Sequence, residues 1–141
     1  MITGIDHIDM AVSDVDGCSK VFQKMGFEVV RHTHHHGGTA EIQLPGPNQP
    51  ILDLHPAIAE HAGGAVGVIH IAFRVDNAQE TYDEFKGRGI VFGKVRGPHF
   101  AEGTGRTLFN WANPNMSAAE AREGLGLYLQ FVGPERKPAT R

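Results

Sequence analysis

The feature that most constrains the fold is an internal repeat. The sequence GIDHIDMAV occupies residues 4–12, and GVIHIAFRV occupies residues 67–75. His7 and His70 lie 63 positions apart, and the same ungapped offset aligns further identical pairs, among them Ile8 with Ile71, Val12 with Val75, Phe22 with Phe85 and Gly26 with Gly89. Matches at one offset over this length indicate a duplicated supersecondary unit.

Each half is predicted to contain a strand, a helix and three further strands. Around His7 and His70 the side chains alternate between two faces, which is the period of a strand. Helices are predicted at 15–25 and 78–88, ended by glycines. The other strands are predicted at 27–33, 39–44 and 50–55 in the first half and at 90–95, 106–112 and 127–132 in the second.

These elements predict an α+β fold in which two tandem strand-helix-three-strand modules form a curled mixed sheet around a cleft. We expect a first module at 1–55, a linker at 56–67, a second module at 68–132 and a tail at 133–141, together making one domain.

The composition narrows the class of protein. The 141 residues are 40% hydrophobic and 21% charged, which suits one folded domain. A net charge of −3 does not favour nucleic acid as a partner, and one cysteine, Cys18, excludes an internal disulfide and suits a reducing compartment. Without a basic-then-apolar leader or a membrane-length apolar run, we expect a cytoplasmic protein. Exposed sheet edges favour a homodimer.

The repeated histidines predict a metal site. If the apolar face of each strand meets a helix, His7 and His70 point together into a concave surface. The same alternation turns one oxygen donor on the last strand of each half, Asp53 and Gln130, toward that surface. Two nitrogens and two oxygens suit a divalent ion with two open positions. The predicted ligands are therefore His7, Asp53, His70 and Gln130, and the ion is Mn, Co, Ni, Fe, Mg or Zn.

The single residue His55 and a histidine-rich stretch leave alternatives open for the metal ligands. His55 also faces the concave surface and competes with Asp53, although it lies at the strand end beside Pro56. RHTHHHGG, residues 31–38, is rich in histidine. We interpret this stretch as a strand end and a turn outside the first metal shell.

At this point the chain resembles the vicinal oxygen chelate superfamily, over about residues 4–132. Paired modules, a histidine on each first strand and an oxygen donor on each fourth strand carry the resemblance. The superfamily includes glyoxalase I, methylmalonyl-CoA epimerase, ring-cleaving dioxygenases, fosfomycin-resistance enzymes and metal-free bleomycin-binding proteins. GIDHIDMA and TAEIQLPG are similar to the epimerase and glyoxalase branch, but Gln130 stands where Glu is usual and Asp53 where Glu or Gln is usual.

The resemblance implies a metal-dependent isomerase, epimerase or lyase acting on a small substrate that chelates the ion through two oxygens. Glu41 matches the position of a glutamate near the metal and is the candidate acid/base. A non-catalytic protein that binds an antibiotic or a metabolite is the alternative, and a dioxygenase is a third hypothesis. Arg106 is expected to be a solvated residue at a strand start or to hold a substrate anion.

Overall fold

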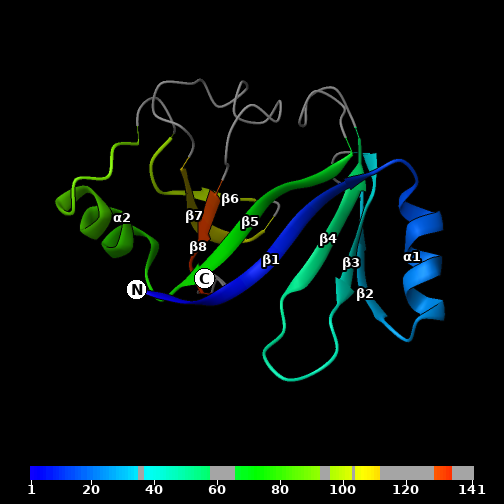
Figure 1. The fold of residues 1–141 in the computed structure, drawn as a ribbon. Helices are drawn as coiled ribbons and strands as arrows, with labels where there is room; N and C mark the ends of the chain where they lie inside the picture. The colour runs from blue at the N-terminus through cyan, green and yellow to red at the C-terminus, as the bar shows by residue number, and fades with distance from the viewer. Residues whose placement is uncertain (35–36, 58–65, 93–95, 103, 112–128, 135–141) are drawn as a thin grey trace, which may run out of the picture.

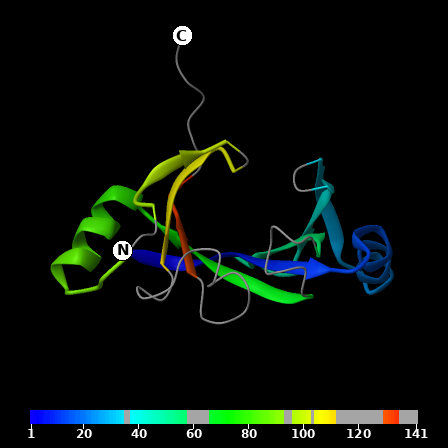
Figure 2. The same cartoon turned by 90° about the horizontal axis from the view of Figure 1, so that it is seen from above.

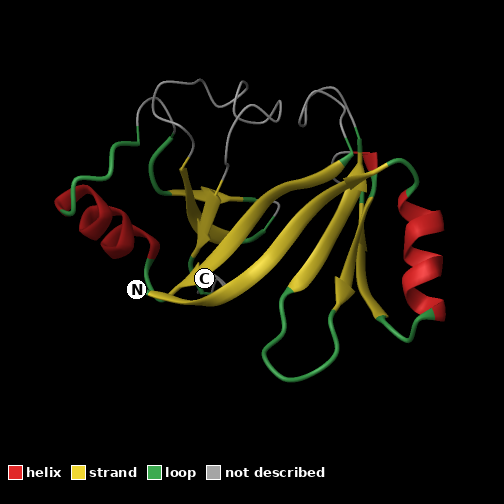
Figure 3. Cartoon of the chain, in the orientation of Figure 1, coloured by secondary structure: helices red, strands yellow, loops and turns green. Residues whose placement is uncertain are grey.

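Among the described residues, the fold is an eight-stranded sheet with two helices, seen as a ribbon in Figure 1 and coloured by secondary structure in Figure 3. The structure is a computed structural model that describes residues 1–34, 37–57, 66–92, 96–102, 104–111 and 129–134. The elements in chain order are β1 (Ile2–Val12), α1 (Val15–Lys24), β2 (Glu28–Thr33), β3 (Thr39–Gln43), β4 (Ile51–Pro56), β5 (Gly67–Val75), α2 (Ala78–Gly87), β6 (His99–Ala101), β7 (Arg106–Trp111) and β8 (Leu129–Val132).

The sheet has the strand order β2-β3-β4-β1-β5-β8-β7-β6. Within each half the first strand pairs parallel to the last, β1 to β4 and β5 to β8, and the other pairings are antiparallel. The halves join through the antiparallel pair of β1 and β5. The order therefore repeats in mirror fashion about this pair, and the predicted α+β fold with a curled mixed sheet is confirmed.

The two ends of the sheet rise toward the same side, so the sheet has a concave and a convex face (Figure 2). Both helices lie outside this curve. On the convex side of the second half, an aromatic core of Phe73, Phe109 and Phe131 packs against Phe85 of α2. Since side chains alternate along a strand, the residues between these aromatics face the concave side.

Both helices begin where the sequence predicts, and each ends one residue earlier than predicted. The side chain of Asp14 accepts a hydrogen bond from the Gly17 amide, and that of Asn77 accepts one from the Glu80 amide, each at 3.0 Å. These N-caps satisfy amides that have no partner within the helix. Gly26 and Gly89 follow the helices with φ values of 93° and 88°, a conformation that glycine adopts at little cost.

One predicted strand is wrong. Residues 90–92 lie outside any strand, and 93–95 fall outside the described residues. The second strand of this half is β6, which lies between the predicted strands 90–95 and 106–112. Phe92 is buried against Tyr82 and Phe109 instead of joining the sheet, so its apolar character reflects the aromatic core. Of the described strands, β7 alone pairs with β6, and this short edge strand carries almost no alternation to recognise.

The module boundaries stay predictions, because most of the expected linker and tail falls outside the described residues. Within the described ranges, no helix is long and apolar enough to cross a membrane.

The aromatic core generates a stability prediction. Phe109 is fully buried and stacks on Phe131 at 4.9 Å between ring centroids. Replacing it with alanine leaves a cavity, so Phe109→Ala is expected to lower the free energy of unfolding by about 3–5 kcal/mol. Urea denaturation measures this loss. Val21→Ala, at a half-exposed position of α1, is the control with a change below about 1 kcal/mol. An equal loss in both variants would contradict the assigned core.

Candidate functional site

The site begins with two histidines on the two central strands. His7 of β1 lies opposite Ala72 of β5, and His70 of β5 lies opposite Asp9 of β1. Their rings meet edge to face with centroids 5.6 Å apart, and both residues are buried. The structure thus brings His7 and His70 together on the concave face.

Polar residues extend from the histidines in two rows across the sheet. Directly paired residues on neighbouring strands share a face. Asp9 pairs with Asp53 of β4, which pairs with Glu41 of β3, and Glu41 pairs with Arg31 of β2. In the second row, Ala72 pairs with Gln130 of β8, which pairs with Asn110 of β7. The concave face therefore carries all four predicted ligands and Glu41.

Two of the predicted ligands present a buried side-chain oxygen to this face, as Asn110 does. Within the described part of the chain, Asp53 Oδ1 and Gln130 Oε1 accept no hydrogen bond. Buried acceptors are normally paired, so both oxygens have capacity for a ligand, a water or an ion. Carboxylate and amide oxygens beside two imidazoles are donors that fit a divalent ion. No three His, Cys, Asp or Glu among the described residues, however, already stand at metal-binding spacing.

Sequence reasoning missed Asp6, which lies beside His7. Oδ2 of Asp6 is 2.8 Å from Nδ1 of His7, and the Arg106 guanidinium binds both carboxylate oxygens. Burial alone raises the pKa of Asp6, but the hydrogen bonds from His7 and Arg106 outweigh it and hold that pKa well below its usual range. Arg106 is therefore neither solvated nor free for a substrate anion, contrary to both expectations.

Sequence reasoning also missed Asp9, the carboxylate at the centre of the site. Its Oδ1 lies 2.9 Å from Nε2 of His55, and its Oδ2 lies 3.3 Å from Nδ1 of His70. Burial raises the pKa of Asp9, yet its interactions with His55 and His70 lower it overall. The signal was present, because Asp9 shares a strand face with His7.

His55 has both ring nitrogens engaged. Besides Asp9 at Nε2, Nδ1 lies 3.1 Å from the Pro56 carbonyl oxygen, which can only accept a hydrogen bond. Burial lowers the pKa of His55, but Asp9 and the Pro56 carbonyl raise it overall, which favours the imidazolium form. An imidazolium has no lone pair for a metal, so this geometry favours Asp53 over His55 as a ligand.

Asp53 is the unusual acid of the site. Burial is the largest cause that raises its pKa to about 7, and the charges of Asp9 and Glu41 add to it. Its neighbour Glu41 is partly exposed and has Oε2 3.3 Å from a guanidinium nitrogen of Arg31. The row thus holds one carboxyl group that titrates near neutral pH.

The stretch 31–38 contributes Arg31 to this row, but its described histidines do not pair into it. His32, on β2, and His34, just after it, are exposed. His35 and His36 fall outside the described residues.

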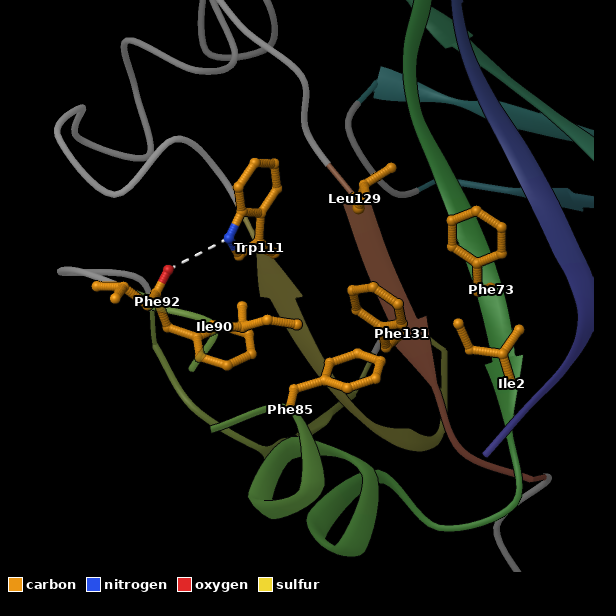
Figure 4. Close-up of a pocket in the computed structure, with 9 residues that line it drawn as sticks. Ile2, Phe73, Phe85, Ile90, Phe92, Trp111, Leu129 and Phe131 are labelled. Carbon is orange, nitrogen blue, oxygen red and sulfur yellow. Dashed lines mark hydrogen bonds between the residues drawn. The ribbon is translucent and has the colours of Figure 1, made fainter. Parts of the chain in front are cut away.

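A separate apolar pocket lies on the convex side between α2 and the strands β5, β7 and β8 (Figure 4). It encloses about 710 Å³, and one Trp111 hydrogen bond to the Val91 carbonyl is its polar contact in the view. It is lined by Ile2, Phe73, Phe85, Ile90, Val91, Phe92, Trp111, Leu129 and Phe131. None of the concave-face acids or histidines contributes to it.

The pKa of Asp53 predicts how stability depends on pH. Between about pH 4, where Asp53 ionises in the unfolded chain, and about pH 7, the folded metal-free protein binds an extra proton there. Its free energy of unfolding therefore falls as pH rises through this window. Asp53→Asn mimics the protonated acid and should flatten this fall, leaving the acid-side loss from Asp6 and Asp9 below about pH 4.

Urea denaturation at several pH values in the presence of a chelator measures this slope. Asp83→Asn, an exposed change on α2, is the control and should keep the wild-type slope. Parallel stability curves for wild type and Asp53→Asn would show that Asp53 titrates normally.

Comparisons with known proteins bear on the fold and on the family of the chain. No curated protein matches the chain significantly in sequence. Methylmalonyl-CoA epimerase of Streptomyces coelicolor, solved in complex with 2-nitronate-propionyl-CoA, is similar in fold with a TM-score of 0.67 and 21% identity, over 94% of this chain and 98% of that chain. The methylmalonyl-CoA epimerase of Mycobacterium tuberculosis has a TM-score of 0.68 and 19% identity, over 96% of this chain and 90% of that chain. A methylmalonyl-CoA epimerase in selenomethionine form has a TM-score of 0.70 and 17% identity, over 97% of this chain and 98% of that chain.

These identities are low and establish the fold alone. The family model does more, because it matches most of the chain. Residues 4–110 match the model of the Glyoxalase/Bleomycin resistance protein/Dioxygenase superfamily. This is the superfamily that the repeated strand histidines indicate, and the chain belongs to it.

Proposed function

We propose that this chain is a metal-dependent isomerase, epimerase or lyase that moves a proton on a carbon next to a carbonyl of a small substrate. The observation that carries the proposal is the set on the concave face: two adjoining imidazoles flanked by two buried oxygens that accept no hydrogen bond within the described chain. Such a set suits chelation of an ion and, through it, of a substrate with two neighbouring oxygens.

The proposed metal ligands are His7, Asp53, His70 and Gln130. The raised pKa of Asp53 supports this set, because it marks a place where added positive charge is favourable. When bound, the ion would polarise the substrate carbonyl as a Lewis acid. Asp53 lies on β4 and Gln130 on β8, and the strands β1 and β5 lie between them in the sheet. One ion can therefore bind both residues only because the sheet is curled.

Glu41 is the proposed acid/base. It adjoins Asp53 on the concave face without belonging to the ligand set, and its side chain is about a quarter exposed, so a substrate can reach it. Arg31 fixes one carboxylate oxygen and leaves the other to take a proton. Gln130 has no basicity to contribute, so a carboxylate of this row is required.

The choice of reaction draws on the similar structures, one of which is a methylmalonyl-CoA epimerase in complex with methylmalonyl-CoA and NH4+. Methylmalonyl-CoA has an acidic carbon between two carbonyl groups and is therefore the first probe. We further propose that the protein acts as a homodimer in the cytoplasm. Light scattering tests whether it is a dimer.

Non-catalytic binding of a metabolite or an antibiotic in the same place is the second candidate. It is favoured by the finding that the described His, Cys, Asp and Glu residues form no group of three at metal-binding spacing. The two functions differ in their need for an ion.

The first prediction concerns metal content. Purified protein loaded with Mn²⁺ or Co²⁺ and desalted is expected to hold about one ion per chain by elemental analysis. His7→Ala and His70→Ala each remove an imidazole and should abolish retention. His32→Ala, at an exposed position on β2, is the matched control. Full occupancy in the His7 and His70 variants would exclude this ligand set.

The second prediction concerns proton transfer. Glu41→Gln keeps the shape of the side chain but removes its basicity, so exchange of the C2 hydrogen of methylmalonyl-CoA with deuterium from solvent should slow by about a hundredfold or more. Metal content should stay unchanged. Glu28→Gln, an exposed change on β2, is expected to exchange at the wild-type rate. Equal rates for wild type and Glu41→Gln would remove Glu41 from the mechanism.

A further inference from the structure

Asp6 occupies a bulge in β1. Ile5 lies opposite Phe73 and His7 lies opposite Ala72, so the register shifts between these pairs and Asp6 has no partner residue of its own. In a regular strand, Asp6 and His7 would face opposite sides of the sheet. Here both are buried on the same side, with Asp6 Oδ2 2.8 Å from His7 Nδ1. The bulge makes this contact between successive residues possible.

Arg106 of the second half holds the Asp6 carboxylate in place. Its two terminal nitrogens lie 2.7 Å and 2.5 Å from the two carboxylate oxygens, and the Arg106 side chain is only 12% exposed. Nε of Arg74 lies 3.4 Å from Asp6 Oδ1. A two-bond contact of this kind fixes the plane of a carboxylate, so the oxygen that faces His7 keeps its direction.

The contact also determines where His7 carries its proton. An ionised carboxylate only accepts hydrogen bonds, so His7 Nδ1 must donate. In the neutral ring this leaves Nε2 deprotonated, with its lone pair available. Within the described chain, the hydrogen bond of the His7 ring is made at Nδ1 and not at Nε2.

We propose that Asp6, held by Arg106, is a positioning residue that fixes His7 in the Nδ1–H form. The lone pair of His7 Nε2 is then presented to the concave face. The part played by His7 Nε2 as a metal ligand rests on the function proposed above. A carboxylate behind a ligating histidine fixes the ring and raises its basicity.

The comparison of the two halves supports a local role. At the repeat offset, the residue that corresponds to Asp6 is Ile69, so the second half has no equivalent carboxylate. His70 Nδ1 instead faces Asp9 Oδ2 at 3.3 Å. Both carboxylates that face the two imidazoles therefore come from β1. They are not part of the residue pattern that the repeat shares.

The test reads the protonated nitrogen directly. A two-bond 1H–15N spectrum of metal-free protein labelled with 15N-histidine, at about pH 8.5 where an ordinary imidazole is neutral, distinguishes the two forms. The His7 signals are identified by their loss in His7→Gln. We expect the Nδ1–H form in wild type. The Nε2–H form in wild type would overturn the proposal, whether or not any variant of Asp6 folds.

Asp6→Asn is the variant that tests the cause. Arg106 favours the amide oxygen, which turns the amide NH2 toward His7 Nδ1 and should convert the ring to the Nε2–H form. The affinity of the Asp6→Asn protein for Co²⁺ should fall by about 10- to 100-fold. Asp83→Asn, exposed on α2, should change neither property. A folded Asp6→Asn protein with the wild-type ring form and affinity would overturn the proposal.

The two measurements separate this inference from the proposed function. If wild type binds no Co²⁺ but shows the Nδ1–H form that Asp6→Asn reverses, Asp6 positions His7 and the metal-dependent function is wrong. If wild type binds Co²⁺ with His7 in the Nε2–H form, the function stands and the role of Asp6 is wrong.

Discussion

The antiparallel pairing of β1 with β5 is the contact on which the rest of the structure depends. It joins the two halves into one sheet and places His70 opposite Asp9, one step along the strand face from His7. Neither half alone can bring two such histidines together. The pairing also contains the bulge that turns Asp6 toward His7, so one interface sets the position, the burial and the hydrogen bonding of His7.

Burial of charge on the concave face needs a reason beyond stability. Asp6 and Asp9 are both buried, each next to cationic or imidazole groups, while burial, together with the charges of Asp9 and Glu41, raises the pKa of Asp53 to about 7. Buried charges reduce stability unless they are paired. A row of buried carboxyl groups in which one has a pKa near neutral is typical of a site that binds a cation or moves a proton. The convex face, by contrast, is held by aromatic packing and carries none of this chemistry.

The sequence predicts most of the fold because the repeat and the alternation of strand faces are local properties. They give both helices, the central strands and the face on which His7, Asp53, His70 and Gln130 lie. Asp6 could not be placed, since a bulge is decided by pairing between strands and strict alternation sends Asp6 to the wrong face. The ion pair of Arg106 could not be predicted either, because its partner Asp6 lies 100 residues away in the chain. Phe92 was assigned to a strand because apolar residues look alike whether they join a sheet or fill a core.

We propose that the concave face binds one metal ion between the two halves. A crystal structure of the Co²⁺-loaded protein, with an anomalous difference map at the cobalt absorption edge, tests it most directly. We expect one strong peak bound by His7 Nε2, His70, Asp53 and Gln130, with the Asp6 carboxylate still hydrogen-bonded to His7 Nδ1. A peak on the exposed His32 and His34 with none between His7 and His70 would contradict it.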